Sequence, residues 1–148
     1  MDEADLQVFI DGTVHYFSQS SNQPAVVGTP YLVDDNKAIT NEYTGIIGVS
    51  GRRKGSVFFT APKKLLKELL VQLGESDDSH EYMCDLVGEV ANTISGNARK
   101  EFGKEFMISV PVVIVGDLER IANPEHLRSF VIPLRWNEID AFLVICLE

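Results

Sequence analysis

Glu89 and Asn92 form the pair whose residue types and spacing could do chemistry on a partner molecule. Three residues apart on a helix, they share one face, separated by about 60° around the axis and one short turn along it. A carboxylate can pair with a cation, and a carboxamide can both donate a hydrogen bond to water and accept one from it. Spacing alone favours the simpler interpretation of a solvated polar face, so the surrounding elements must be considered.

The helix that carries this pair is the best-marked element of the sequence. Asp78 and Glu81 have the spacing of a capping box, and Gly103 is a stop signal, which predicts about 24 helical residues spanning about 36 Å. Helical spacing gives an apolar face of Met83, Leu86, Val87, Val90, Ile94 and Ala98, and a polar face of Asp85, Glu89, Asn92, Gly96 and Arg99. Gly88 and Gly96 each cost about 1 kcal/mol relative to Ala, which predicts either tight packing on the protein's own sheet or approach of another backbone.

The chain as a whole predicts one α/β (α+β) domain over residues 1–148, with a largely antiparallel sheet covered by helices. Segments expected to be strands are 24–33, 38–50, 56–60, 107–115, 129–136 and 140–147, with a turn near Asn137. A short amphipathic helix is expected between Pro62 and Gly74. Residues 8–16 fit both an Asp-Gly hairpin and a helical stripe, and propensity slightly favours the hairpin.

Composition excludes several classes of partner. The 148 residues include 13 basic and 22 acidic side chains, a net charge of −9, which repels nucleic acid. No apolar run approaches the ~20 residues that cross a bilayer, so no membrane span is expected. Two cysteines are too few for a disulfide scaffold, and the acidic start lacks the features of a secretory signal. We therefore expect a reducing, cytoplasmic location.

Three other constellations favour structural interpretations. Arg52, Arg53 and Lys54 lie among glycines but lack the phosphate-loop spacing, and predict a charged hairpin tip. His80 and Cys84 are one helical turn apart, but no third metal ligand is spaced with them, which favours a buried, unreactive thiol. Trp136 is expected at a surface turn with its indole half buried.

The sequence around Glu89 and Asn92 resembles the Glu-x-x-Asn helix of the CheX branch of the CheC-like chemotaxis phosphatases. The resemblance rests on Glu89-Val90-Ala91-Asn92 followed by Gly96-Asn97-Ala98-Arg99, on residues 44–51 and 54–57 before the helix, and on residues 108–113 after it. These patterns occur in that family's order and cover most of the chain. The family's opening helix aligns with residues 9–14, which outweighs the hairpin interpretation there.

The resemblance implies an enzyme that hydrolyses the aspartyl phosphate of a response-regulator receiver domain such as CheY. Asn92 would hold the attacking water in line with phosphorus, and Glu89 would engage the receiver's active-site lysine. No cofactor or metal of its own is expected, because the receiver supplies Mg²⁺. Asp11 and Val14 stand where other CheC-like proteins carry a second Glu-x-x-Asn, so one site per chain is expected. The family also implies a homodimer joined through its sheets.

Two other functions stay open on the sequence. One is a non-enzymatic dimeric binding module that keeps the fold while sequestering a response regulator or another protein. The other is a sensor that binds a small ligand in the groove between helix and sheet.

Overall fold

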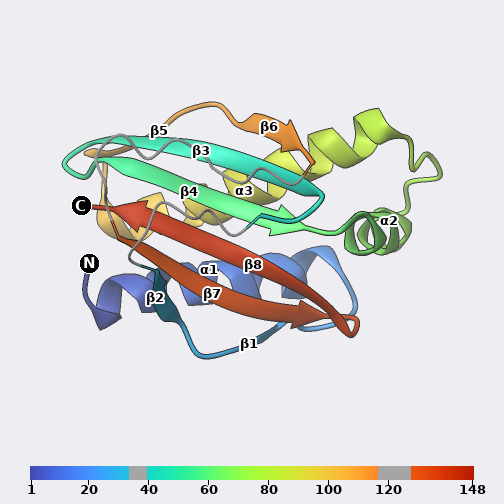
Figure 1. Ribbon diagram of the computed structural model, residues 1–148, viewed down its shortest axis with the longest axis horizontal. Coiled ribbons are helices and arrows are strands. Elements are labelled where there is room, and N and C mark those ends of the chain that lie inside the picture. The colour runs from blue at the N-terminus through green and yellow to red at the C-terminus, as the bar shows by residue number, and fades with distance from the viewer. Residues whose placement is uncertain (34–39, 117–127) are drawn as a thin grey trace.

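The computed structural model of the protein describes residues 1–33, 40–116 and 128–148. Within them the chain forms three helices and eight strands (Figure 1). The helices are α1 (Glu3–Ser20), α2 (Lys63–Gln72) and α3 (His80–Phe102). The strands are β1 (Val26–Val27), β2 (Tyr31–Val33), β3 (Tyr43–Gly51), β4 (Gly55–Ala61), β5 (Phe106–Ile108), β6 (Val112–Val115), β7 (Ser129–Trp136) and β8 (Ile139–Leu147).

One sheet joins all eight strands in the order β1-β7-β8-β4-β3-β5, with β2 also pairing β7 and β6 also pairing β3. Every one of these pairings is antiparallel. Helices α1 and α3 lie side by side behind the sheet in Figure 1, and α2 lies at one end of it. The predicted α/β domain, an antiparallel sheet covered by helices, is confirmed.

The first segment is a helix, and the hairpin favoured by propensity is wrong. Asp2 caps α1 in a reciprocal capping box with Asp5. The Asp-Gly pair that suggested a turn lies inside the helix, because the face of α1 that carries Gly12 also carries Phe9, Thr13, Tyr16 and Phe17 and is buried. Tertiary packing of one face of α1 thus overrides the local turn preference.

Two of the predicted strands are interrupted. Residues 24–33 form two short strands, β1 and β2, and residues 107–115 form β5 and β6. Both β5 and β6 pair with β3, but between the pairs 49–108 and 46–112 two residues of β3 (47 and 48) oppose three residues of the partner segment (109 to 111), which is a β-bulge. Pro111 lies in this bulge, where its missing N–H costs no ladder hydrogen bond. Part of the expected strand 38–50, residues 38–39, lies outside the described residues.

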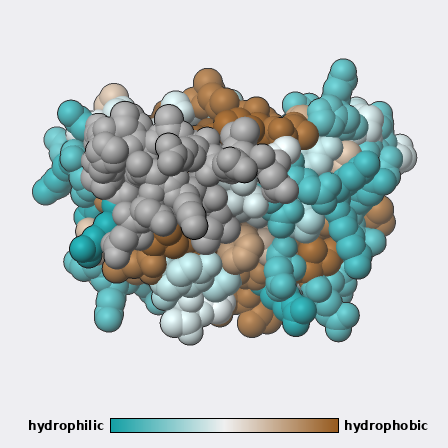
Figure 2. Space-filling model, in the orientation of Figure 1, coloured by the Kyte–Doolittle hydropathy of each residue, from teal (hydrophilic) through white to brown (hydrophobic). Residues whose placement is uncertain are grey.

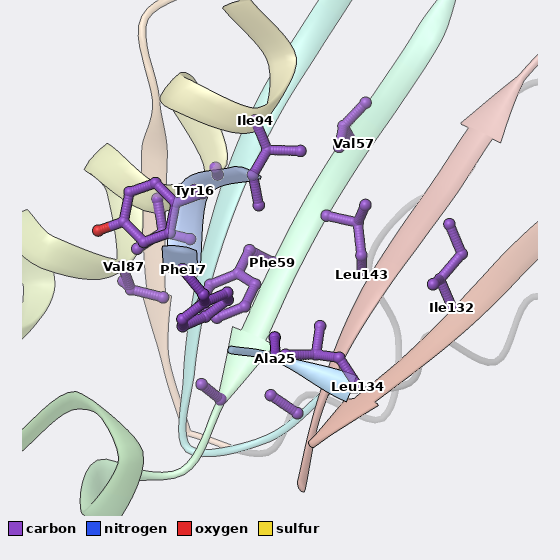
Figure 3. Close-up of a cluster of buried hydrophobic side chains, with 14 of the residues drawn as sticks. Tyr16, Phe17, Ala25, Val57, Phe59, Val87, Ile94, Ile132, Leu134 and Leu143 are labelled. Carbon is purple, nitrogen blue, oxygen red and sulfur yellow. The ribbon is translucent and has the colours of Figure 1, made fainter. Parts of the chain in front are cut away.

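Aromatic side chains join α1 to the sheet, as the close-up of the core shows (Figure 3). The Phe17 ring centroid lies 6.3 Å from that of Phe59 and 5.8 Å from that of Trp136. Trp136 is fully buried, so the expectation of a half-buried surface indole is wrong. The turn itself is formed by Asn137 and Glu138, both with positive φ, which leaves Trp136 as the last inward-facing residue of β7. Its Nε1 donates to Ser21 Oγ at 3.0 Å.

Helix α3 lies directly on β3 at Gly45. A Cβ built on Gly45 would come well inside 3.0 Å of the Val87 carbonyl oxygen, and the obstacle is helix backbone rather than a movable side chain. On either side, Tyr43 and Ile47 of the same strand face are buried. The absence of a side chain at Gly45 therefore sets how closely α3 can approach the sheet.

We expect Gly45→Ala to lower the free energy of unfolding by about 1–3 kcal/mol, because the added methyl must push helix backbone away from the sheet. Urea unfolding followed by circular dichroism measures this loss. Gly48→Ala in the same strand is the matched control, since its methyl would meet only Ser109, with Oγ at 3.3 Å. A loss at Gly45 no larger than that at Gly48 would contradict the close approach.

Candidate functional site

Helix α3 is held at both ends by specific caps. The Ser79 side chain accepts a hydrogen bond from the Tyr82 N–H, so Ser79 is the N-cap and the capping box predicted at Asp78 is wrong. Asp78 lies one residue before this N-cap, and its carboxylate is 3.9 Å from the Lys67 ammonium. At the other end Gly103 adopts φ 96°, which confirms the predicted stop. The site residues thus lie in the middle of a capped helix whose opposite face is buried.

Glu89 and Asn92 are both exposed on α3, as the helical spacing predicted. Within the described residues, neither side chain has a hydrogen-bond or ion-pair partner in the same chain. Asp85 and Arg99 of the predicted polar face are exposed as well. The face therefore offers an unpaired carboxylate and an unpaired carboxamide to an approaching molecule, on backbone that packing against the sheet holds in place.

The Asn92 side of this face borders the bulge between β5 and β6. A Cβ at Gly88 would lie 3.2 Å from Val113 Cγ2 and 3.3 Å from Pro111 Cβ, so Gly88 is explained by packing on the protein's own sheet. This was the simpler of the two predicted reasons for a glycine there. The bulge thus supports α3 from the side, one turn away from Asn92.

The Glu89 side borders α1. Tyr16 of α1 is buried, and burial raises its pKa to about 12, with the nearby negative charge of Glu89 adding to the rise and a hydrogen bond to the Ser20 side chain opposing it. The phenol is therefore neutral at physiological pH. Tyr16 was not among the predicted site residues. Its position seven residues after Phe9 is the sequence signal that places it on the buried face of α1.

Helix α1 carries no second pair of the Glu-x-x-Asn type. Asp11 is exposed, and its carboxylate accepts a hydrogen bond from Gln7 Nε2 at 2.8 Å. Val14, three residues further on, offers no hydrogen-bonding group. In the described part of the chain, an exposed carboxylate and carboxamide at this spacing thus occur together on α3 and not on α1.

His80 and Cys84 do meet, and a third residue joins them. Cys84 Sγ lies 3.5 Å from His80 Nε2, and the Tyr43 hydroxyl lies 2.9 Å from His80 Nδ1. Desolvation raises the pKa of the Cys84 thiol, and the carboxylates of Asp85 and Glu81 raise it further. The sulfur is therefore held in its unreactive thiol form, as expected for a structural cysteine. The contact between the Tyr43 hydroxyl and His80 ties the first turn of α3 to β3.

The basic segment forms the tip of the β3–β4 hairpin, as predicted. The Arg53 guanidinium pairs with Asp5 of α1 at 2.7 Å and lies over the Phe102 ring. A small cavity of about 170 Å³ lies there, lined by Arg52, Arg53, Phe102 and Phe106. A strand follows this tip instead of a helix, so it lacks the helix N-terminus that a phosphate loop requires.

Over residues 1–33, 40–116 and 128–148, no three His, Cys, Asp or Glu side chains are grouped so that they could hold a metal ion. None of the helices in these segments is both long and apolar enough to cross a membrane.

Solved structures share this arrangement over almost the whole chain. A CheC-like superfamily protein from Shewanella sp. PV-4 is 29% identical, with a TM-score of 0.85 over 100% of this chain and 99% of that one. The chemotaxis protein CheX from Desulfovibrio desulfuricans is 26% identical, with a TM-score of 0.83 over 98% and 99% of the two chains. CheX in the CheX–CheY–BeF₃–Mg²⁺ complex from Borrelia burgdorferi is 20% identical, with a TM-score of 0.76 over 97% of each chain.

The mixed α/β domain and its antiparallel sheet are thus those of the CheC-like superfamily. The sequence profile of the family described as "Chemotaxis phosphatase CheX" matches residues 43–135, which include β3, α3 and most of β7. The chain belongs to the CheX family. No curated protein sequence matches it significantly.

We expect Cys84 to react with iodoacetamide more slowly than free cysteine at pH 7.5, because its raised pKa leaves a smaller fraction as thiolate. The rate should increase as the pH rises toward and beyond 9. Mass spectrometry of the alkylated protein measures it, and Cys84→Ser reports the background from buried Cys146. Faster alkylation than free cysteine would restore the case for a nucleophilic thiol.

Proposed function

We propose that this protein is a phosphatase that hydrolyses the aspartyl phosphate of a CheY-like receiver domain. The observation that carries the proposal is the exposed, unpartnered pair Glu89 and Asn92 on the fixed face of α3. Membership of the chemotaxis phosphatase family supports it, and a protein of the same fold, CheX of Borrelia burgdorferi, forms a complex with CheY. Receiver domains act in the cytoplasm, so the proposal implies a cytoplasmic location.

Asn92 would hold the attacking water in line with the phosphorus atom. Hydrolysis of an acyl phosphate passes through a loose transition state that needs little covalent assistance, so placing the nucleophile supplies much of the rate. A carboxamide suits this role because it orients water without bringing a second anion next to the phosphoryl group. With no partner in the described part of its own chain, the Asn92 side chain need not break a hydrogen bond before it binds the water.

Glu89 would pair with the lysine of the receiver's active site. The unpaired carboxylate of Glu89 can form a charge-assisted hydrogen bond when a cation approaches. Such a bond contributes about 1.5–3 kcal/mol to the free energy of binding. The contact would set the register of the two proteins, so that Asn92, one turn further along α3, reaches the phosphoryl group. The Mg²⁺ ion in this scheme belongs to the receiver, and the phosphatase contributes no metal ligand.

We expect Asn92→Ala to lower the rate of phosphate loss from a phosphorylated CheY receiver by about 10²-fold, about 2.7 kcal/mol, because the attacking water loses its anchor. Release of ³²P-phosphate from the labelled receiver measures the rate. Asn22→Ala, an exposed asparagine beyond α1, is the matched control and should retain the wild-type rate. Equal rates for Asn92→Ala and wild type would eliminate the mechanism, and binding of the receiver without acceleration by wild type would favour a sequestering module.

We further propose that the protein forms a homodimer through the free edge of β6. In the described residues β6 pairs only with β3, and hydrophobic side chains gather along this edge, over β5 and β6 (Figure 2). Its exposed members are Met107, Val110, Val112 and Val115, with Val110 81% exposed. An apolar strand edge favours pairing with another strand, and two copies of one edge can pair antiparallel about a two-fold axis.

We expect Val112→Lys to convert the dimer into a monomer at micromolar concentration, because two lysines would meet at a desolvated strand edge. Size-exclusion chromatography with light scattering measures the mass. Val71→Lys on α2, at a position 67% exposed compared with 58% for Val112, is the control and should leave the mass unchanged. A dimer that survives Val112→Lys, or a wild-type monomer, would contradict this interface.

A further inference from the structure

Gly96 is a glycine inside a long helix that packing within the described chain does not explain. It lies in the body of α3, where glycine costs stability relative to alanine because it loses more backbone freedom on folding. Apart from its chain neighbours and the nearby backbone of α3 itself, a Cβ built at this position would meet no atom within 4 Å. An alanine would therefore fit here and would favour the helix.

Other glycines near α3 have a packing reason that Gly96 lacks. Gly45 admits the helix backbone, and Gly88 admits Pro111 and Val113. The residue after Gly96 is also in contact, since a Cβ at Gly12 would lie 3.6 Å from Asn97 Cβ. Helix α3 is thus packed on its α1 side at Asn97 and left open at Gly96.

The opening lies on the same face as the proposed site. Gly96 is four residues after Asn92 and seven after Glu89, which places it about 6 Å beyond Asn92 along the axis and almost in line with Glu89. Arg99, the next residue of this face, is exposed. Two unpartnered polar side chains and a gap where a side chain could stand therefore form one continuous strip of α3.

We propose that Gly96 is the position where the main chain of the receiver comes into contact with α3. Without a Cβ, the helix backbone can be approached about one methyl group more closely than at any neighbouring exposed residue. A partner loop seated there would bring its phosphoaspartate within reach of the water held by Asn92, one turn away. The inference rests on the proposed function and adds to it a specificity-determining residue that stabilises docking and takes no part in the chemistry.

The test compares Gly96→Ala with wild type in two measurements. The dissociation constant for a CheY receiver from the same genome, activated with beryllofluoride and Mg²⁺, should rise about 5- to 100-fold, because the methyl group intrudes into a close contact. KM for phosphorylated receiver should rise by a similar factor with kcat changed less than twofold. The melting temperature should increase by about 1–4 °C, since alanine favours the helix.

Gly12→Ala is the matched control, a glycine-to-alanine change in a helix at a buried position of α1 where the added Cβ would make only ordinary contacts of 3.5 Å or more, and it should leave the dissociation constant unchanged. A Gly96→Ala protein that is more stable and binds the receiver as tightly as wild type would overturn the inference while leaving the phosphatase proposal intact. If wild type binds the receiver without accelerating phosphate loss, the phosphatase proposal is wrong. The dissociation constants of wild type and Gly96→Ala would still decide the role of Gly96. A wild-type protein that binds no receiver would contradict both the phosphatase proposal and the role of Gly96.

Discussion

Helix α3 rests on strand β3 with no side chain between the Val87 carbonyl and Gly45. This contact limits the height of α3 above the sheet, and with it the height of every residue on the exposed face. A second close contact, between Gly88 and the bulge at Pro111, limits sideways movement of the same turn. Glu89 follows directly after this doubly held turn, and Asn92 lies one turn further on. A site that must hold a water molecule against another protein's phosphoryl group needs such rigid backbone, because small displacements reduce the rate strongly.

The surroundings of this face are arranged to leave it free. Three basic side chains have partners of their own: Arg53 pairs with Asp5, Lys67 is near Asp78, and His80 contacts Tyr43 and Cys84. Tyr16, the buried neighbour of Glu89, stays neutral because burial raises its pKa to about 12. It therefore adds no charge to the site. The carboxylate and the carboxamide thus remain available to a partner, since in the described part of the chain neither has an intramolecular hydrogen bond.

Local signals in the sequence predicted most of the elements but missed where packing overruled them. The helical spacing from Met83 to Ala98 gave the buried face of α3 and the exposure of Glu89 and Asn92 correctly, since a periodic pattern this long leaves little ambiguity. The hairpin prediction from the Asp-Gly pair in α1 was wrong because burial of Phe9, Tyr16 and Phe17 along one helical face outweighs the local turn preference. The prediction of a half-buried indole at Trp136 was wrong because the positive-φ turn begins one residue later, at Asn137. Trp136 therefore still belongs to the strand, and its indole points into the core. The predicted N-cap of α3, Asp78, is one residue away from the observed one, Ser79. Both residue types are good N-caps, so the sequence did not separate them.

The sequence alone determined which chemical groups the protein presents. These are one carboxylate and one carboxamide, three residues apart on a helix face, in a pattern that matched its family. This much is local, because helix periodicity depends only on neighbours along the chain. The tertiary structure decided whether the pair is accessible, what holds it and which glycines are explained. Gly45, Gly88 and Gly96 look alike in the sequence, yet a Cβ added at the first would meet helix backbone, at the second a bulge, and at the third nothing within 4 Å outside its own stretch of helix. The difference comes from segments distant in the chain, whose approach no local pattern encodes.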